Sequence, residues 1–216
     1  MRLFKKQVSL LMLFAMMIVA VPVRGKAAEV SDNTMNGNIN LMEPSDGVVI
    51  SEALTYDEMV QVIARDKKIS LLEAEKIVGP RPDTTSRNSI ASESYRTISK
   101  TFSLGMFGTY KPYVLYYCRT SESGAYWGIV EVLNTMLMRD GGIGLYRFEG
   151  ELYTHLQSPY QIYYSISGDF YEFGEQSSTT SSSIGLDEYL TIGYSVSESN
   201  NFFDNISEYG VLQTQY

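Results

Sequence analysis

Two residue types that can form a nucleophile–base pair occur once each in this chain. Cys118 is the single cysteine and His155 the single histidine of the 216 residues. A thiol beside an imidazole is a nucleophile activated by a base. However, Cys118 follows Val114 and Tyr116 at every second position, which is the spacing of one strand face, where a small buried cysteine packs as an apolar residue. No third residue that would orient the imidazole is indicated, so the sequence predicts no catalytic residue here.

A second chemical possibility is the carboxylate pair Glu149 and Glu151. The two residues flank Gly150 and share one face if the segment is a strand. Glycoside hydrolysis uses two carboxyl groups about 5–9.5 Å apart, so a glycan hydrolase that uses Glu149 and Glu151 is one functional alternative. Two exposed charges on a solvent face explain the pair more simply. The chain shows no metal-ligand spacing, phosphate loop or dinucleotide fingerprint, and we expect no metal and no cofactor.

Tyrosine is abundant and unevenly placed. Of the 17 tyrosines, all but Tyr56 lie at or beyond Tyr95. An exposed surface of Tyr, Ser and Gly binds well, because tyrosine offers a large area at low entropic cost and a hydroxyl for hydrogen bonds. The predicted ligand-binding residues surround one expected hairpin and are Tyr113, Tyr117, Tyr126 and Trp127, with Tyr110 nearby. The alternative is that most of these rings fill a sheet core and only their hydroxyls reach its rim.

The N-terminal segment indicates export. Residues 1–6 carry three basic side chains, residues 8–21 are apolar apart from Ser9, and small residues follow at Ala27 and Ala28. This order is typical of a secretory signal peptide, with cleavage after Ala27. The apolar run is shorter than the ~20 residues of a membrane span, and an uncleaved anchor is the alternative. We expect a signal peptide over residues 1–27, a secreted mature chain and no stable membrane span after cleavage.

The charge balance limits the partners. The whole chain has a net charge of −8, and removal of residues 1–27 leaves 12 basic and 25 acidic residues, a net charge of −13. Such a chain repels nucleic acid and anionic membranes, so neither is an expected partner. A single cysteine excludes an internal disulfide. The sequence indicates no oligomeric state.

The elements that would position these residues fall into two kinds. Residues 28–53 are rich in Asn, Ser and Asp and predict a flexible leader with a short ordered patch at 47–50. Residues 54–79 predict a helical hairpin, because Thr55 with Glu58 and Ser70 with Glu73 form two capping boxes. The pair resembles part of a helix-turn-helix module and of a LysM repeat, but its acidic second helix lacks the cations of a DNA reader. Residues 80–94 predict a linker.

From Tyr95 to Tyr216 the hydrophobic period changes to two, which predicts a Tyr-rich antiparallel β domain. Residues 161–174 are interpreted as a hairpin with a type II′ turn at Gly168 and Asp169. That register places Ile162, Tyr164, Ile166, Tyr171 and Phe173 on the buried face and Phe170 with Ser165 on the other. Residues 189–196 and 210–214 predict two further strands. Seven to nine short strands favour an antiparallel β-sandwich or small barrel preceded by a short αα-hairpin.

This layout resembles that of small uncharacterised exported proteins of Gram-positive bacteria, through its signal peptide, acidic mature chain, helical pair and Tyr-rich β region. The resemblance implies secretion and assigns no site. The leading functional hypothesis is a secreted, non-enzymatic β domain that binds an extracellular or cell-surface partner, either a glycan or a protein. A second hypothesis is a membrane-active, toxin-like protein in which residues 177–183 rearrange, although this Ser/Thr tract lacks the alternating apolar residues of a membrane hairpin. The third is the glycan hydrolase described above.

Overall fold

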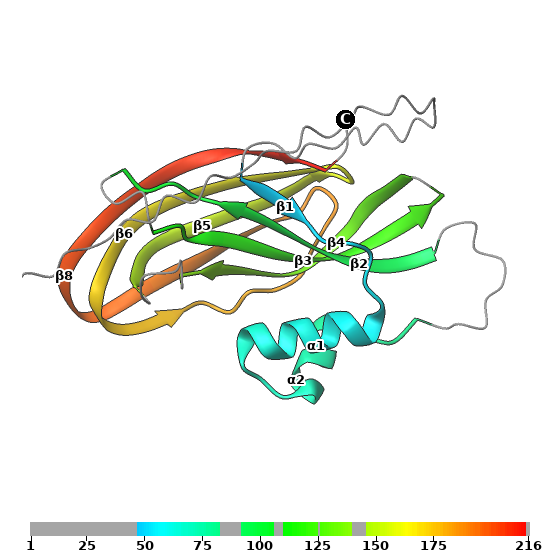
Figure 1. Ribbon diagram of the computed structural model, residues 1–216, viewed down its shortest axis with the longest axis horizontal. Helices are drawn as coiled ribbons and strands as arrows, with labels where there is room; N and C mark the ends of the chain where they lie inside the picture. Colours follow the sequence, from blue (N-terminus) through cyan, green and yellow to red (C-terminus); the bar gives the residue numbers. More distant parts are fainter. Residues whose placement is uncertain (1–46, 83–91, 106–109, 125, 140–145, 215–216) are drawn as a thin grey trace, which may run out of the picture. The chain divides into compact units, whose positions relative to one another are not determined.

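The computed structural model describes residues 47–82, 92–105, 110–124, 126–139 and 146–214. The expected signal peptide lies outside these residues, as do residues 28–46 of the expected leader and residues 83–91 of the expected linker. The described chain consists of β1 (Val48–Ile50), α1 (Tyr56–Lys67), α2 (Leu71–Val78), β2 (Ser92–Thr101), β3 (Tyr113–Ser123), β4 (Tyr126–Met138), β5 (Arg147–Ser158), β6 (Gln161–Ser178), β7 (Ile184–Gly185) and β8 (Tyr189–Gln213). The expectation of a mainly antiparallel β fold preceded by an αα-hairpin is confirmed (Figure 1).

Both helices begin at the residues that the sequence indicates. The Thr55 and Ser70 hydroxyls each accept a hydrogen bond from the backbone N–H three residues on, and Glu58 and Glu73 accept in return from the cap backbone. Each reciprocal pair satisfies two of the N–H groups that a helix start leaves without partners. Lys68 ends α1 in the left-handed conformation, with φ of 56°. The capping residues therefore set the length of α1 and the tight turn into α2.

The first sheet has the strand order β1-β2-β3-β4-β7, and all its described pairs are antiparallel. β3 is buried on both faces, as its apolar sequence requires. On one face Leu115 and Tyr117 pack against the helices, in a cluster that includes Met59, Ile63 and Ala74. Figure 1 shows α1 and α2 next to β2, β3 and β4. The αα-hairpin is thus held to the sheet by its own hydrophobic core, which explains why α1 carries an apolar stripe.

The other face of the first sheet shares a larger core with the second sheet. β5, β6 and β8 of the second sheet pair in a closed arrangement, because β8 pairs with β6 along nearly its whole length and also with β5. The shared core joins residues from both sheets, among them Ile98, Val114, Tyr116, Cys118, Phe148, Leu152, Ile162 and Phe170. A strand as long as β8, from Tyr189 to Gln213, unites the two strands expected at 189–196 and 210–214.

The hairpin expected at 161–174 is wrong. β6 runs without a turn through Gly168, which pairs with Gly150 of β5 and Ile206 of β8. In a continuous strand the alternation persists, so Ile162, Tyr164 and Ile166 are buried as expected, whereas the inward residue further on is Phe170. The hairpin register places Tyr171 and Phe173 on the buried face, but Tyr171 is only partly buried and Phe173 is 59% exposed.

The two paired glycines explain why Gly168 and Asp169 are not a turn. A Cβ added at Gly168 would lie 2.2 Å from the Glu149 carbonyl oxygen and 2.7 Å from the Phe148 ring. A Cβ at Gly150, where φ is +153°, would lie 2.6 Å from the Gly168 Cα. The glycines therefore permit a close approach of β5 and β6 under the Phe148 ring, an arrangement in which an aromatic ring covers bare backbone in a sheet.

Candidate functional site

The structure separates the four predicted binding residues. Tyr117 is fully buried against the helices, and its hydroxyl donates to Asp66 Oδ2 at 3.1 Å. Burial and the neighbouring Asp66 carboxylate raise the pKa of Tyr117. Tyr113 is partly buried against the same cluster. Trp127 is 7% exposed, and the Arg96 guanidinium lies 4.6 Å from its ring centroid. Tyr110, which precedes the same expected hairpin, is fully buried in the shared core.

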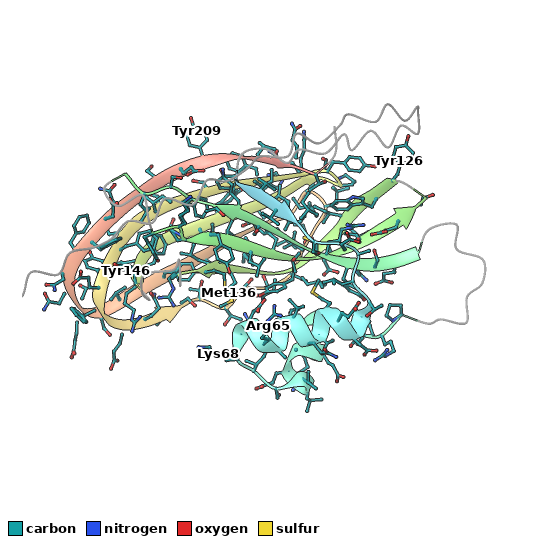
Figure 2. All side chains as sticks on the ribbon, in the orientation of Figure 1. Arg65, Lys68, Tyr126, Met136, Tyr146 and Tyr209 are labelled. Atoms are coloured by element: carbon teal, nitrogen blue, oxygen red, sulfur yellow. The ribbon has the colours of Figure 1, made fainter. Side chains whose placement is uncertain are left out.

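Tyr126 is the one predicted binding residue with a largely exposed ring, at 73%. It lies at the turn between β3 and β4, where Ser123 pairs with Tyr126 (Figure 2). A hollow of about 280 Å³ adjoins it and is bordered by Trp127, Pro159 and Tyr160. Tyr126 and Trp127 are therefore brought together, while Tyr113 and Tyr117 line none of the hollows described for residues 47–214.

The structure separates Cys118 from His155 and places Glu149 and Glu151 on the exposed surface. Cys118 is fully buried in the shared core, and burial raises the pKa of its thiol. His155 alternates with the buried Thr154 and Leu156 and so faces outward from β5, where its Nε2 lies 3.2 Å from Asp187 Oδ1. Glu149 and Glu151 are both exposed on the outer face of β5. The structure thus does not join Cys118 to His155.

Tyrosines gather instead on the outer face of the closed sheet. Strand register places two rows of residues side by side across β8, β6, β5 and the start of β8: Val211, Tyr163, His155 and Tyr189 in one row, and Tyr209, Ser165, Tyr153 and Thr191 in the next. We call these eight residues the tyrosine face. Each alternates with a residue turned toward the core, such as Ile162, Leu152 or Leu212.

The rings of the tyrosine face contact one another and remain accessible. Tyr153 lies between Tyr163, with ring centroids 5.9 Å apart, and Tyr189, with centroids 5.8 Å apart in a stacked arrangement. Tyr189 is 67% and Tyr209 76% exposed. Figure 2 shows the Tyr209 side chain pointing away from the β8 ribbon. Partly buried rings, Tyr153 and Tyr163, thus stand beside the exposed rings of Tyr189 and Tyr209.

Polar residues continue the same outer face beyond Tyr153. The next row pairs Ser207, Ser167, Glu151 and Gly193, and the row after it pairs Asn205, Asp169 and Glu149. The face therefore changes along the strands from aromatic rings to hydroxyls and then to carboxylates. A ligand with flat apolar patches and many hydroxyl groups could contact the rings and the hydroxyls together.

Part of the tyrosine face can be predicted from the sequence. The strand alternation already puts Tyr163 and Ser165 on the outward side, opposite Ile162 and Tyr164. The rows across the sheet require the register between β5, β6 and β8, and the expected turn at Gly168 prevented β6 from being paired along its length with β8. The local signal for the face is limited to Tyr153 and Tyr163, each of which has buried residues on both sides, whereas Tyr189 and Tyr209 have no buried neighbour in the chain.

Within the described residues, no three His, Cys, Asp or Glu side chains gather closely enough to hold a metal ion. The helices of the described part of the chain are too short or too polar to cross a membrane. Comparison of the chain with protein-family models, with curated proteins and with solved structures finds no match.

Proposed function

We propose that this chain is an exported, non-enzymatic binding protein whose tyrosine face binds an extracellular glycan. The observation that carries the proposal is the side-by-side placement of Tyr153, Tyr163, Tyr189 and Tyr209 on one outer sheet surface. Export is supported by the basic, apolar and small-residue order of residues 1–27.

The physical argument for a glycan rests on complementary surfaces. A tyrosine ring has a negative face, against which the weakly positive C–H groups of a sugar ring can stack. The Tyr153 and Tyr189 rings lie 5.8 Å apart with 25° between their planes, and Tyr189 is 67% exposed, so aromatic surface is available at this place. Ser165, Thr191 and the tyrosine hydroxyls supply donors and acceptors for sugar hydroxyls. Because the rings are already held by strand pairing and by each other, little conformational entropy is lost on binding.

A glycan fits this surface better than a protein partner does. The buried centre of a protein interface is apolar and depleted in charged residues. On the tyrosine face the aliphatic contribution is Val211, and the adjoining rows bring serines and then Glu151, Glu149 and Asp169. Hydroxyl-rich surroundings suit a polyhydroxylated ligand, whereas they would leave a protein interface with polar groups to desolvate.

The test compares tyrosines in two places. The mature chain, residues 28–216, is screened on a glycan array and in pull-downs with insoluble polysaccharides, and binding is then measured for Tyr153→Ser, Tyr163→Ser and Tyr189→Ser. Each substitution should weaken binding about two- to tenfold, the value of one aromatic contact. Tyr126→Ser is the matched control, because this ring is about as open as Tyr189 but lies at the β3–β4 turn. Loss of binding only in Tyr126→Ser would move the site to the hollow beside it and refute the tyrosine face.

A glycan hydrolase is a second candidate, favoured by one observation. Glu151 and Glu149 continue the outer face of β5 directly beyond Tyr153. A polysaccharide lying across the rings would pass both carboxylates. Release of reducing ends from a bound polysaccharide, lost in Glu151→Gln while binding persists, would favour hydrolysis. Intact polysaccharide after prolonged incubation with the wild-type chain would exclude it for that ligand.

A further inference from the structure

A hollow lies at the open edge of β4. β7 pairs with β4 only at Glu131 and Val132, and the chain then separates from the strand. Further along, the Thr135 amide donates to Ser181 Oγ at 3.1 Å and the Leu137 amide donates to the Tyr194 hydroxyl at 3.2 Å. Side chains therefore take the place of a paired strand. The space that this leaves is a cleft of about 420 Å³, which we call the edge cleft.

The charge of the edge cleft is opposite to that of the chain. Lys67 and Arg139 line it, together with hydroxyl and amide side chains, and no carboxylate of the described residues does so. The whole chain, in contrast, has 25 acidic and 17 basic residues. A cationic cleft in an acidic protein focuses anions from solution, because low-dielectric walls concentrate the field of the charges that line it.

Lys67 is held toward the cleft. It is the last residue of α1, where the helix dipole favours a cation. Its Nζ donates to Asn134 Oδ1 at 3.0 Å, and the Asn134 amide nitrogen donates in turn to the Ser181 carbonyl at 3.4 Å. Partial burial lowers the pKa of Lys67. An ammonium has three donors, and the described residues provide it with an amide oxygen but no carboxylate.

The rest of the lining supplies uncharged polar groups and the apolar side chains of Ile77, Met136, Leu137 and Ile192. Thr179 and Thr180 are exposed at the mouth of the cleft, and Thr135 is 2% exposed with a hydroxyl that has no partner among the described residues. The Arg139 guanidinium donates to Gln176 Oε1 at 2.7 Å and to the Tyr146 carbonyl at 3.0 Å, which holds it in place. The lining thus combines cations with hydroxyls at a volume suited to a small molecule.

We propose that the edge cleft binds a small hydroxylated carboxylate, the chemistry of a uronic acid, with Lys67 facing the carboxylate. This site is separate from the tyrosine face and does not depend on it. The Thr and Ser hydroxyls of residues 178–181 meet the hydroxyl groups of the ligand, so the Ser/Thr tract has a binding role.

The experiment uses two pairs of matched probes. Binding of glucuronate and galacturonate to the mature chain is measured by titration calorimetry and by amide chemical shifts, with glucose and galactose as the uncharged counterparts. We expect the uronic acids to bind at least tenfold more tightly than the neutral sugars and to shift amides around Asn134 and Ser181. Lys67→Met should abolish this preference, since it removes the charge and keeps the length of the side chain. Lys68→Met is the control, because Lys68 is exposed and next in the chain (Figure 2).

A purely structural role for Lys67 gives a different result. If its bond to Asn134 only joins α1 to the sheet, Lys67→Met lowers the melting temperature but leaves the glucuronate-to-glucose ratio of affinities as in the wild type. That ratio remaining unchanged, or the uronic acids failing to bind the wild-type chain at millimolar concentration, overturns the proposal. Tyr153→Ser should leave uronic-acid binding intact, which keeps the outcome independent of the tyrosine face.

Discussion

Replacement of Gly168 by alanine tests the close approach of β5 and β6, on which the position of the tyrosine face depends. An added Cβ would lie 2.2 Å from the Glu149 carbonyl oxygen, a backbone atom that cannot turn aside. It would also lie 2.7 Å from the Phe148 ring. Gly193 of β8 is the matched control, since a Cβ there meets nothing nearer than the Thr179 methyl at 3.8 Å.

The expected size of the effect follows from these distances. Overpacking of a well-packed site costs about 1–3 kcal/mol, and a backbone clash belongs at the upper end of that range. Exchange of glycine for alanine also stabilises the folded state by roughly 0.4–1 kcal/mol, because it lowers the conformational entropy of the unfolded chain. Gly168→Ala should therefore lower the free energy of unfolding by about 2 kcal/mol, whereas Gly193→Ala should leave it unchanged or raise it slightly.

Urea denaturation followed by circular dichroism measures the difference. With a slope of about 1–3 kcal/mol per molar urea, the midpoint of Gly168→Ala should fall by roughly 1 M relative to Gly193→Ala. Equal midpoints for the two variants would refute the close approach of the strands at Gly150 and Gly168, and with it the register that assembles the two rows of the tyrosine face.

Three further predictions follow from burial and from pKa shifts. Phe170→Ala should cost about 3–5 kcal/mol and Phe173→Ala less than about 0.5 kcal/mol in urea unfolding, because Phe170 is fully buried and Phe173 is 59% exposed; the reverse order would restore the turn at Gly168. Burial raises the pKa of Tyr95 to about 12. The folded state therefore keeps a proton that the unfolded state loses near pH 10. The resulting stabilisation is complete below about pH 10, and the free energy of unfolding should fall by up to roughly 2–3 kcal/mol between pH 10 and 12. The Tyr95→Phe variant should not show this alkaline loss of stability. If its free energy of unfolding depends on pH as the wild type's does, the raised pKa of Tyr95 is refuted. Ile63→Ala should cost about 2–5 kcal/mol as the cluster that holds α1 to the sheet opens, and a variant as stable as the wild type would show that the helices contribute little to folding.

Local signals predicted the local structure well. The capping boxes at Thr55 and Ser70 fix where each helix begins, because the chemistry involves residues only three apart. The period of two placed Val114, Tyr116 and Cys118 on one strand face, and all three are buried in the shared core. The short patch expected at 47–50 contains β1, Val48–Ile50.

Signals that depend on distant partners were less informative. Gly168 and Asp169 have the composition of a turn, yet the glycine is required by the Gly150 backbone opposite it, 18 residues earlier in the chain. The turn expected at Gly168 and Asp169 is absent, and the prediction therefore put Tyr171 and Phe173 on the wrong face of the sheet. The extent of β8 could not be read locally either, since its pairing with all of β6 is what keeps it extended.

The candidate site likewise depends on contacts between distant parts of the chain that a local sequence pattern does not reveal. Tyr117 and Trp127 were chosen for their ring chemistry, but a ring binds a ligand only if nothing else covers it, and the helices cover Tyr117 while Arg96 lies against Trp127. Of the four, Tyr126 alone is largely exposed. The tyrosine face and the edge cleft arise from sheet register and from the separation of β7 from β4, neither of which a local pattern contains.

The most direct test of the central claim is the glycan affinity of the double variant Tyr153→Ser/Tyr189→Ser beside that of Tyr126→Ser. The double variant removes both tyrosine rings of the stacked pair, whose centroids lie 5.8 Å apart in the wild-type chain. For a polysaccharide that the wild-type mature chain binds, we predict a loss of about fivefold or more in the double variant and an unchanged affinity in Tyr126→Ser. Unchanged affinity in the double variant, with its melting temperature preserved, would contradict glycan binding by the tyrosine face.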